Sequence, residues 1–139
     1  MALKVPNQGE LYLLDLILAD QDNWTLRLFK NNVTPGDSDT FATYTEADFD
    51  GYNSIDGTDL NMAAATTVTG KASSTGDQQT FEHDGGGASN SIYGYYVTIG
   101  AGGGAKVLWA ERLPSPPQTM ANMGDNIKVT PKFTFSSES

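Results

Sequence analysis

The chain has 139 residues, the size of one domain, and apolar residues make up 38% of it, which is enough for a core. It contains no cysteine, which excludes disulfides and thiolate metal sites. The net charge is −9 and the eight basic residues are scattered, which argues against a nucleic-acid-binding surface. No stretch resembles a membrane span or a secretory signal, so we expect no membrane partner and folding in a cytoplasm.

We predict that residues 1–10 form an extended N-terminal arm and that residues 11–139 form one β domain. Pro6 and Gly9 disfavour a helix in this segment. The segment also carries few charges, and its apolar residues suit docking on a partner.

The apolar run LYLLDLILA (11–19) is compatible with a helix or a strand. Its even-numbered positions from Tyr12 to Leu18 are uniformly apolar, so we predict a strand buried on that face. WTLRLFK (24–30) alternates clearly and predicts a second strand. A turn joins the two, which indicates a hairpin, and the loop 31–39 follows.

YTEADFDGY (44–52) predicts one short helical turn with Phe49 packed inward. Thr45 suits an N-cap, and acidic residues follow it, where the helix dipole favours them. The alternative is a calcium loop, but the acidic spacing does not match the pattern of such loops.

The middle of the chain predicts strands over residues 60–72 and 78–84, with a turn at 73–77 and a flexible loop at 84–90. Residues 91–113 then predict two strands joined by the glycine-rich turn GAGGGA (100–105). An extended proline-containing segment follows this pair of strands.

NIKVTPKFTF (126–135) alternates and predicts the last strand. The chain therefore holds about seven or eight short strands and little helix. This pattern predicts an all-β fold, a single compact β-sandwich or jelly-roll-like barrel with an extended N-terminal arm.

Four aromatic residues in the last third form the most conspicuous candidate surface: Tyr93, Tyr95, Tyr96 and Trp109. Alternation puts Tyr93 and Tyr95 on one face of their strand and Tyr96 on the other. We expect them in the core or in a subunit interface, where aromatic residues dominate. A platform for a glycan is the alternative.

No residue pattern predicts catalysis or a cofactor. His83 is the single histidine, and Asp84 beside it points to the opposite face of a strand, so the pair does not form part of a triad. GAGGGAK (100–106) lacks the ending of a phosphate loop and joins two strands. The acidic residues show no pairing typical of a glycosidase or a metal site.

Four segments resemble short reading frames found among the virion structural genes of tailed bacteriophages: LRLFKNNVTP (26–35), TEADFDGY (45–52), SIYGYYVT (91–98) and VLWAER (107–112). The resemblance covers most of the chain, and its strings are family signatures rather than chemical motifs. It implies a small, non-enzymatic virion protein. Capsid decoration (cement) proteins fit best, since they are small, β-rich, cysteine-free and commonly trimeric.

The resemblance implies that the major capsid protein is the partner, that the protein is a homotrimer and that it lies on the capsid surface. The arm would then supply the capsid contacts, through Leu3, Lys4, Val5 and Pro6. The main rival is a tail or fibre module that binds a host glycan through the tyrosine and tryptophan cluster. An enzyme is the third possibility and lacks any motif.

Overall fold

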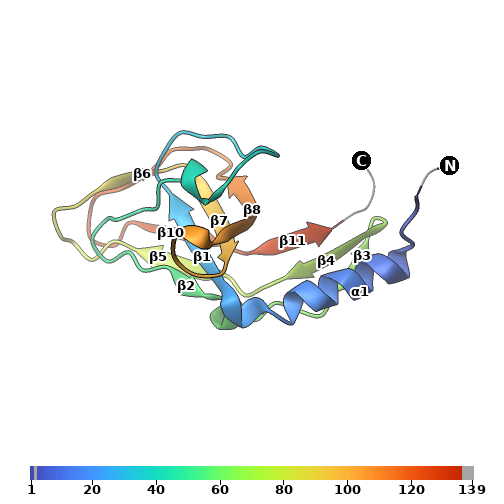
Figure 1. Cartoon of the computed structure of the whole chain (residues 1–139). Helices are drawn as coiled ribbons and strands as arrows, with labels where there is room; N and C mark the ends of the chain where they lie inside the picture. The colour runs from blue at the N-terminus through green and yellow to red at the C-terminus, as the bar shows by residue number, and fades with distance from the viewer. Residues whose placement is uncertain (2, 136–139) are drawn as a thin grey trace.

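A computed structural model describes residue 1 and residues 3–135 of the chain (Figure 1). Within them the fold is all-β, with short antiparallel sheets in a sandwich-like arrangement and one α-helix, as the alternation of the sequence predicted. The elements are α1 (Asn7–Leu18), β1 (Trp24–Phe29), β2 (Ile55–Asp56), β3 (Thr66–Val68), β4 (Lys71–Thr75), β5 (Gln79–Glu82), β6 (Asn90–Ile92), β7 (Gly94–Ile99), β8 (Lys106–Arg112), β9 (Gln118–Met120), β10 (Asn126–Val129) and β11 (Lys132–Phe135), with 3-10 turns at Gln21–Asn23, Phe41–Thr43, Gly57–Leu60 and Gly102–Gly104.

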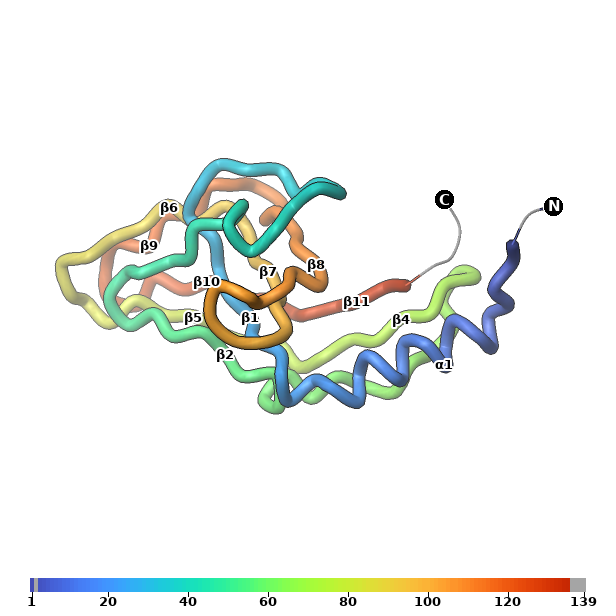
Figure 2. The backbone as a smooth tube through the Cα atoms, viewed as in Figure 1, coloured from blue at the N-terminus to red at the C-terminus, as the bar shows by residue number. Residues whose placement is uncertain are grey.

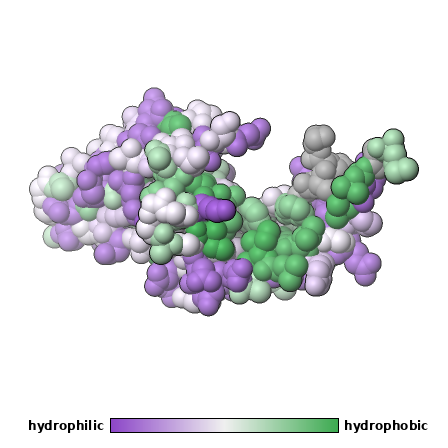
Figure 3. All heavy atoms as spheres, in the orientation of Figure 1, coloured by the Kyte–Doolittle hydropathy of each residue, from purple (hydrophilic) through white to green (hydrophobic). Residues whose placement is uncertain are grey.

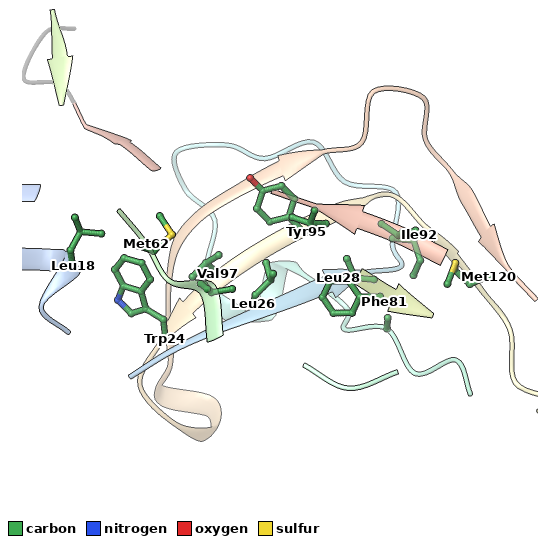
Figure 4. Packing of buried hydrophobic residues seen from close by; sticks show 14 of the residues in the cluster. Leu18, Trp24, Leu26, Leu28, Met62, Phe81, Ile92, Tyr95, Val97 and Met120 are labelled. Carbon is green, nitrogen blue, oxygen red and sulfur yellow. The ribbon is translucent and has the colours of Figure 1, made fainter. Parts of the chain in front are cut away.

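β1 lies inside the largest sheet, whose strand order is β2-β1-β7-β8. Its alternation is the one that the sequence predicts: Trp24, Leu26 and Leu28 enter the main core. Residues of β5, β6, β9 and β10 cover that side, among them Phe81, Ile92 and Met120 (Figure 4). Phe29 faces a second, smaller aromatic cluster.

A long two-stranded ribbon ties the molecule together. Residues 71–82 pair with residues 126–135, and each partner is interrupted near its middle (Figure 2). At the interruption the Gly76 N–H donates a hydrogen bond to Pro131 O (2.8 Å). Proline has no N–H to continue the ladder, so the single strand predicted over 126–135 is two strands, β10 and β11.

The segments predicted as a strand at 60–72 and a turn at 73–77 are different in the structure. The chain reverses at Thr69 and Gly70, both with positive φ (51° and 74°), which makes the tight hairpin turn between β3 and β4. Residues 73–75 belong to β4. A threonine with positive φ is uncommon, so composition gave no signal for the turn.

The strand predicted over residues 11–19 is wrong, and so is the extended conformation predicted for residues 7–10, because α1 covers both. Pro6 is the N-cap of α1, a position where a missing N–H costs no hydrogen bond, and its carbonyl accepts the Glu10 N–H (3.0 Å). Leucine favours helix, and Leu14 and Leu18, one turn apart, are both buried. Ala2 lies outside the described residues.

The helical turn predicted over 44–52 is also absent, although Phe49 is buried as expected. This segment runs beside β1 instead. Lys30 N–H donates to Thr45 O (2.8 Å) and Ala47 N–H donates to Leu28 O (3.0 Å), so its backbone groups bind the sheet rather than one another. The pair of strands predicted over 91–113 is confirmed for β7 and β8, but residues 90–92 form a separate strand, β6, which pairs with β9.

Two regions make up the molecule. We call α1, β3, β4 and β11 the extension and the remaining elements the body. The extension projects to one side of the body, and α1 packs along its three-stranded sheet, whose order is β11-β4-β3 (Figure 1). The first and last elements of the described chain, α1 and β11, both belong to the extension.

We expect Gly76→Ala to destabilise the fold by about 1 to 3 kcal/mol, because overpacking at a close backbone approach is costly. A Cβ at position 76 would lie 2.5 Å from Leu60 O and 2.7 Å from the Met62 sulfur. Urea unfolding measures the change. Gly87→Ala is the matched control, since a Cβ there meets nothing within 4 Å. Equal stabilities for the two variants would contradict this account of the interruption.

Candidate functional site

Trp109 lies where the body meets the extension. Its ring stands edge-on to Trp24 of β1 (centroids 5.6 Å apart) and stacks on Phe133 of β11 (4.8 Å). Its Nε1 lies 3.4 Å from Tyr95 Oη. Trp109 is half-buried and is therefore a packing residue of the junction within one chain.

The three tyrosines do not form one surface. Tyr95 and Tyr96 are 5% and 1% exposed and enter the main core and the second cluster, respectively. Burial raises the pKa of each hydroxyl to about 12. Their burial leaves them little area for a subunit interface, which agrees with the core alternative.

Tyr93 packs with the cluster that contains Tyr96, contrary to the predicted alternation that put it with Tyr95. The reason is a break in the strand: β6 ends at Ile92 and β7 begins at Gly94. The half-buried ring of Tyr93 also receives the Arg112 guanidinium, 5.6 Å from its centroid.

A groove runs between the loop 35–44 and β8. One part has a volume of about 360 Å³ and is lined by Asp37, Asp39, Tyr44 and the Val107–Ala110 stretch, among others. A neighbouring part of about 340 Å³ shares Asp39 and Val107. β8 is an edge strand of its sheet, so the groove combines aromatic rings, carboxylates and strand backbone.

The hydrogen bond between Tyr44 and Asp39 shapes this groove. The Tyr44 hydroxyl donates to Asp39 Oδ2 (2.6 Å), and the same oxygen accepts the Gly36 N–H (2.7 Å). These bonds lower the pKa of the Asp39 carboxyl, the tyrosine bond most. Burial, together with Asp39, raises the pKa of Tyr44. The loop is thus held against the Tyr44–Tyr96 stack, whose centroids are 4.8 Å apart.

The predicted capsid-contact residues lie before α1, at the outer end of the extension. Leu3 and Lys4 are exposed, with Leu3 at 92%, while Val5 is half-buried and lies close to Gly9 in the first turn of the helix. Pro6 is the helix N-cap. The arm is therefore shorter than the ten residues predicted.

Sequence reasoning missed the exposed apolar face of α1. Tyr12, Leu13 and Leu16 are 66%, 40% and 51% exposed. The signal was present in LYLLDLILA, where apolar residues surround the whole helix rather than one stripe. The groove had no comparable signal, because its two walls come from distant parts of the chain.

His83 is completely buried at the end of β5 and acts in packing. Its Nδ1 accepts the Gly85 N–H (3.0 Å), so the proton is on Nε2, which donates to Ala88 O (2.9 Å). The ring stacks on Phe49. Both ring nitrogens are thus used in holding the 84–90 loop.

Metal-ligating clusters and membrane-spanning helices are both absent from the described residues. No group of three or more histidine, aspartate or glutamate residues is placed to hold a metal ion in residues 1 and 3–135. In the same residues no helix is long and apolar enough to cross a bilayer.

Known proteins offer no direct guide to the function of this chain. No protein family, curated protein or solved structure matches it. The groove, the N-terminal segment and the apolar face of α1 are the features that bear on function.

Tyr44→Phe should raise the pKa of Asp39 towards its ordinary value of about 3.9, because the largest cause of the lowering is removed. The lowered pKa makes the Asp39 carboxylate stabilise the fold above that ordinary value, and this contribution is lost as the pH falls through the lowered pKa. Carboxyl NMR titration measures the change. The pKa of Asp48, lowered chiefly by its hydrogen bond to Lys30, should stay where it is.

His83→Ala should lower the free energy of unfolding by at least about 2 kcal/mol, because the Gly85 N–H and Ala88 O lose their partner. Glu82→Ala, an exposed change next to it in β5, is the control and should be close to neutral. Denaturant unfolding compares the two. An enzymatic activity that disappears in a His83 variant of unchanged stability would contradict a purely structural role.

Proposed function

We propose that the chain is a non-enzymatic structural protein of a phage virion, a capsid decoration protein that binds the outer surface of the head as a homotrimer and stabilises it. The major capsid protein is its partner. The observation that carries the proposal is the division of the molecule into a body and an extension that ends in an exposed, apolar N-terminal segment.

The N-terminal segment has the properties of an adhesive end. Met1 and Leu3 are exposed apolar residues, and a protein in water gains by covering such side chains. The four residues before Pro6 in the described chain also carry backbone groups outside α1, which suits addition to a strand of a partner. Many copies on one shell would offset weak single contacts through multivalency.

The body suits a role outside the shell. The whole chain has seventeen Asp and Glu residues against eight Lys and Arg, and α1, β3, β4 and β11 together hold only two of these acids, Glu10 and Asp15. An excess of negative charge keeps neighbouring knobs apart and hydrated. The packed core and the long ribbon make the body a rigid knob, which a cement protein needs.

The groove supports a second candidate function, the binding of a host-surface glycan by a tail or fibre module. Trp109 and Tyr44 line it beside Asp37 and Asp39. Aromatic rings that stack on sugars and carboxylates that accept hydroxyl hydrogens are the groups that carbohydrate sites use. Asp37→Ala, a change at an exposed residue of the groove, should weaken glycan binding, if it exists, and leave head binding intact.

Location in the particle separates the two candidates. Quantitative mass spectrometry of purified virions should find copies on the order of hundreds, as expected for a protein bound at repeated symmetry positions of the head. A few to dozens of copies would place the protein in the tail and contradict the capsid proposal. A density map of the virion locates the protein directly.

Deletion of residues 1–5 should weaken binding to heads that lack the protein by at least about tenfold, since the adhesive segment is lost. The deletion leaves Pro6 to cap α1, so the fold should persist, which circular dichroism and urea unfolding check. Co-sedimentation with heads measures binding. Met123→Ala, a change at an exposed apolar residue of the body, is the control. Binding equal to that of the full chain after the deletion would contradict the role of this segment.

A further inference from the structure

α1 carries two apolar faces. One holds Leu14 and Leu18, which are buried against the sheet of the extension. The opposite face carries Gly9, Tyr12, Leu16 and Ala19, at spacings of three, four and three residues. This is the spacing of a helix that packs along another helix, with large side chains in the middle and small ones at each end. Tyr12 and Leu16 are exposed and Gly9 is half-buried, and a hydrophobic patch lies over α1 (Figure 3).

The four residues of this face are uncharged, although the chain as a whole is strongly acidic. α1 contains two acids, and neither lies among these four residues. Glu10 is 2% exposed, and Asp15 lies at the side of the helix, where its Oδ1 accepts the Ala65 N–H before β3 (3.2 Å). Asp15 is exposed at the flank and exposed Asp20 follows the helix, so the nearest charges border the apolar residues and do not interrupt them.

We infer that the open face of α1 is where copies of this chain meet, helix against helix, around a symmetry axis. The face is self-complementary, because a second α1 presents the same apolar spacing and no charged residue within it. Two acidic bodies, by contrast, repel each other. The extension holds the helix away from the body, so the bodies need not touch when the helices do.

The size of the face favours a ring over a pair. α1 is twelve residues long, which corresponds to about 18 Å, and a stable pair buries about 800 Å² on each partner. In a ring each helix contacts two others, so each copy buries two small contacts instead of one. A trimer, the number taken from the proposed function, closes such a ring. We therefore expect an association that weakens on dilution.

Sedimentation analysis of the isolated protein tests the inference without any capsid. The wild type should form an oligomer whose mass falls on dilution, and Leu16→Glu should raise the dissociation constant at least about tenfold, because it puts like charges into the contact. Met123→Glu is the matched control. Met123 is 76% exposed and lies in the body, so the same change there should leave the oligomer intact.

The absence of cysteine allows a second, independent measurement. Leu16→Cys should form a covalent dimer on mild oxidation with oxygen or a disulfide exchanger, and Met123→Cys should not. A wild type that is monomeric at high micromolar concentration would overturn the inference. So would an oligomer that Leu16→Glu leaves unchanged and Leu16→Cys does not crosslink. Failure to bind heads, with these results intact, would count against the proposed function alone.

Discussion

The contact on which the shape of the molecule depends is the aromatic row Trp24, Trp109 and Phe133. Trp24 belongs to β1, Trp109 to the edge strand β8 and Phe133 to the extension, so three segments distant in sequence meet in one packed row. Leu18 and Met62 lie at the same end of the core (Figure 4). Because aromatic rings pack with defined geometry, this row fixes the direction in which the extension leaves the body.

The ribbon of residues 71–82 and 126–135 supplies the second link between the two regions. Its interruption at Gly76 and Pro131 lets the outer half pair in the sheet of the extension and the inner half cover the core of the body. Two strands thus serve two sheets without an additional crossing of the chain. A side chain at Gly76 would strike the Leu60 carbonyl, which explains why the smallest residue occupies the joint.

The same separation gives the functional proposals their physical basis. Acidic bodies repel one another, whereas apolar helix faces associate in water. The extension separates the two surfaces, so one small chain can carry both. The N-terminal segment and the open face of α1 then have different tasks, adhesion to the shell and contact between copies. The groove beside Trp109 is independent of both, since it is formed by the body.

Much of the fold followed from local pattern, because β1, β5 and the β7–β8 hairpin alternate or contain β-branched and aromatic residues, and their backbones need only a neighbouring strand. The sequence by itself therefore determined an all-β chain, a buried Phe49 and the absence of thiol chemistry. Tertiary structure decided the rest. The segment LYLLDLILA is helical as far as Leu18, and its Leu14 and Leu18 are buried against the sheet of the extension. The backbone of segment 44–52 forms hydrogen bonds with β1 and does not form a helical turn. Neither the groove nor the aromatic row could be predicted from the sequence, because each is formed by residues from distant segments that meet only in the folded chain.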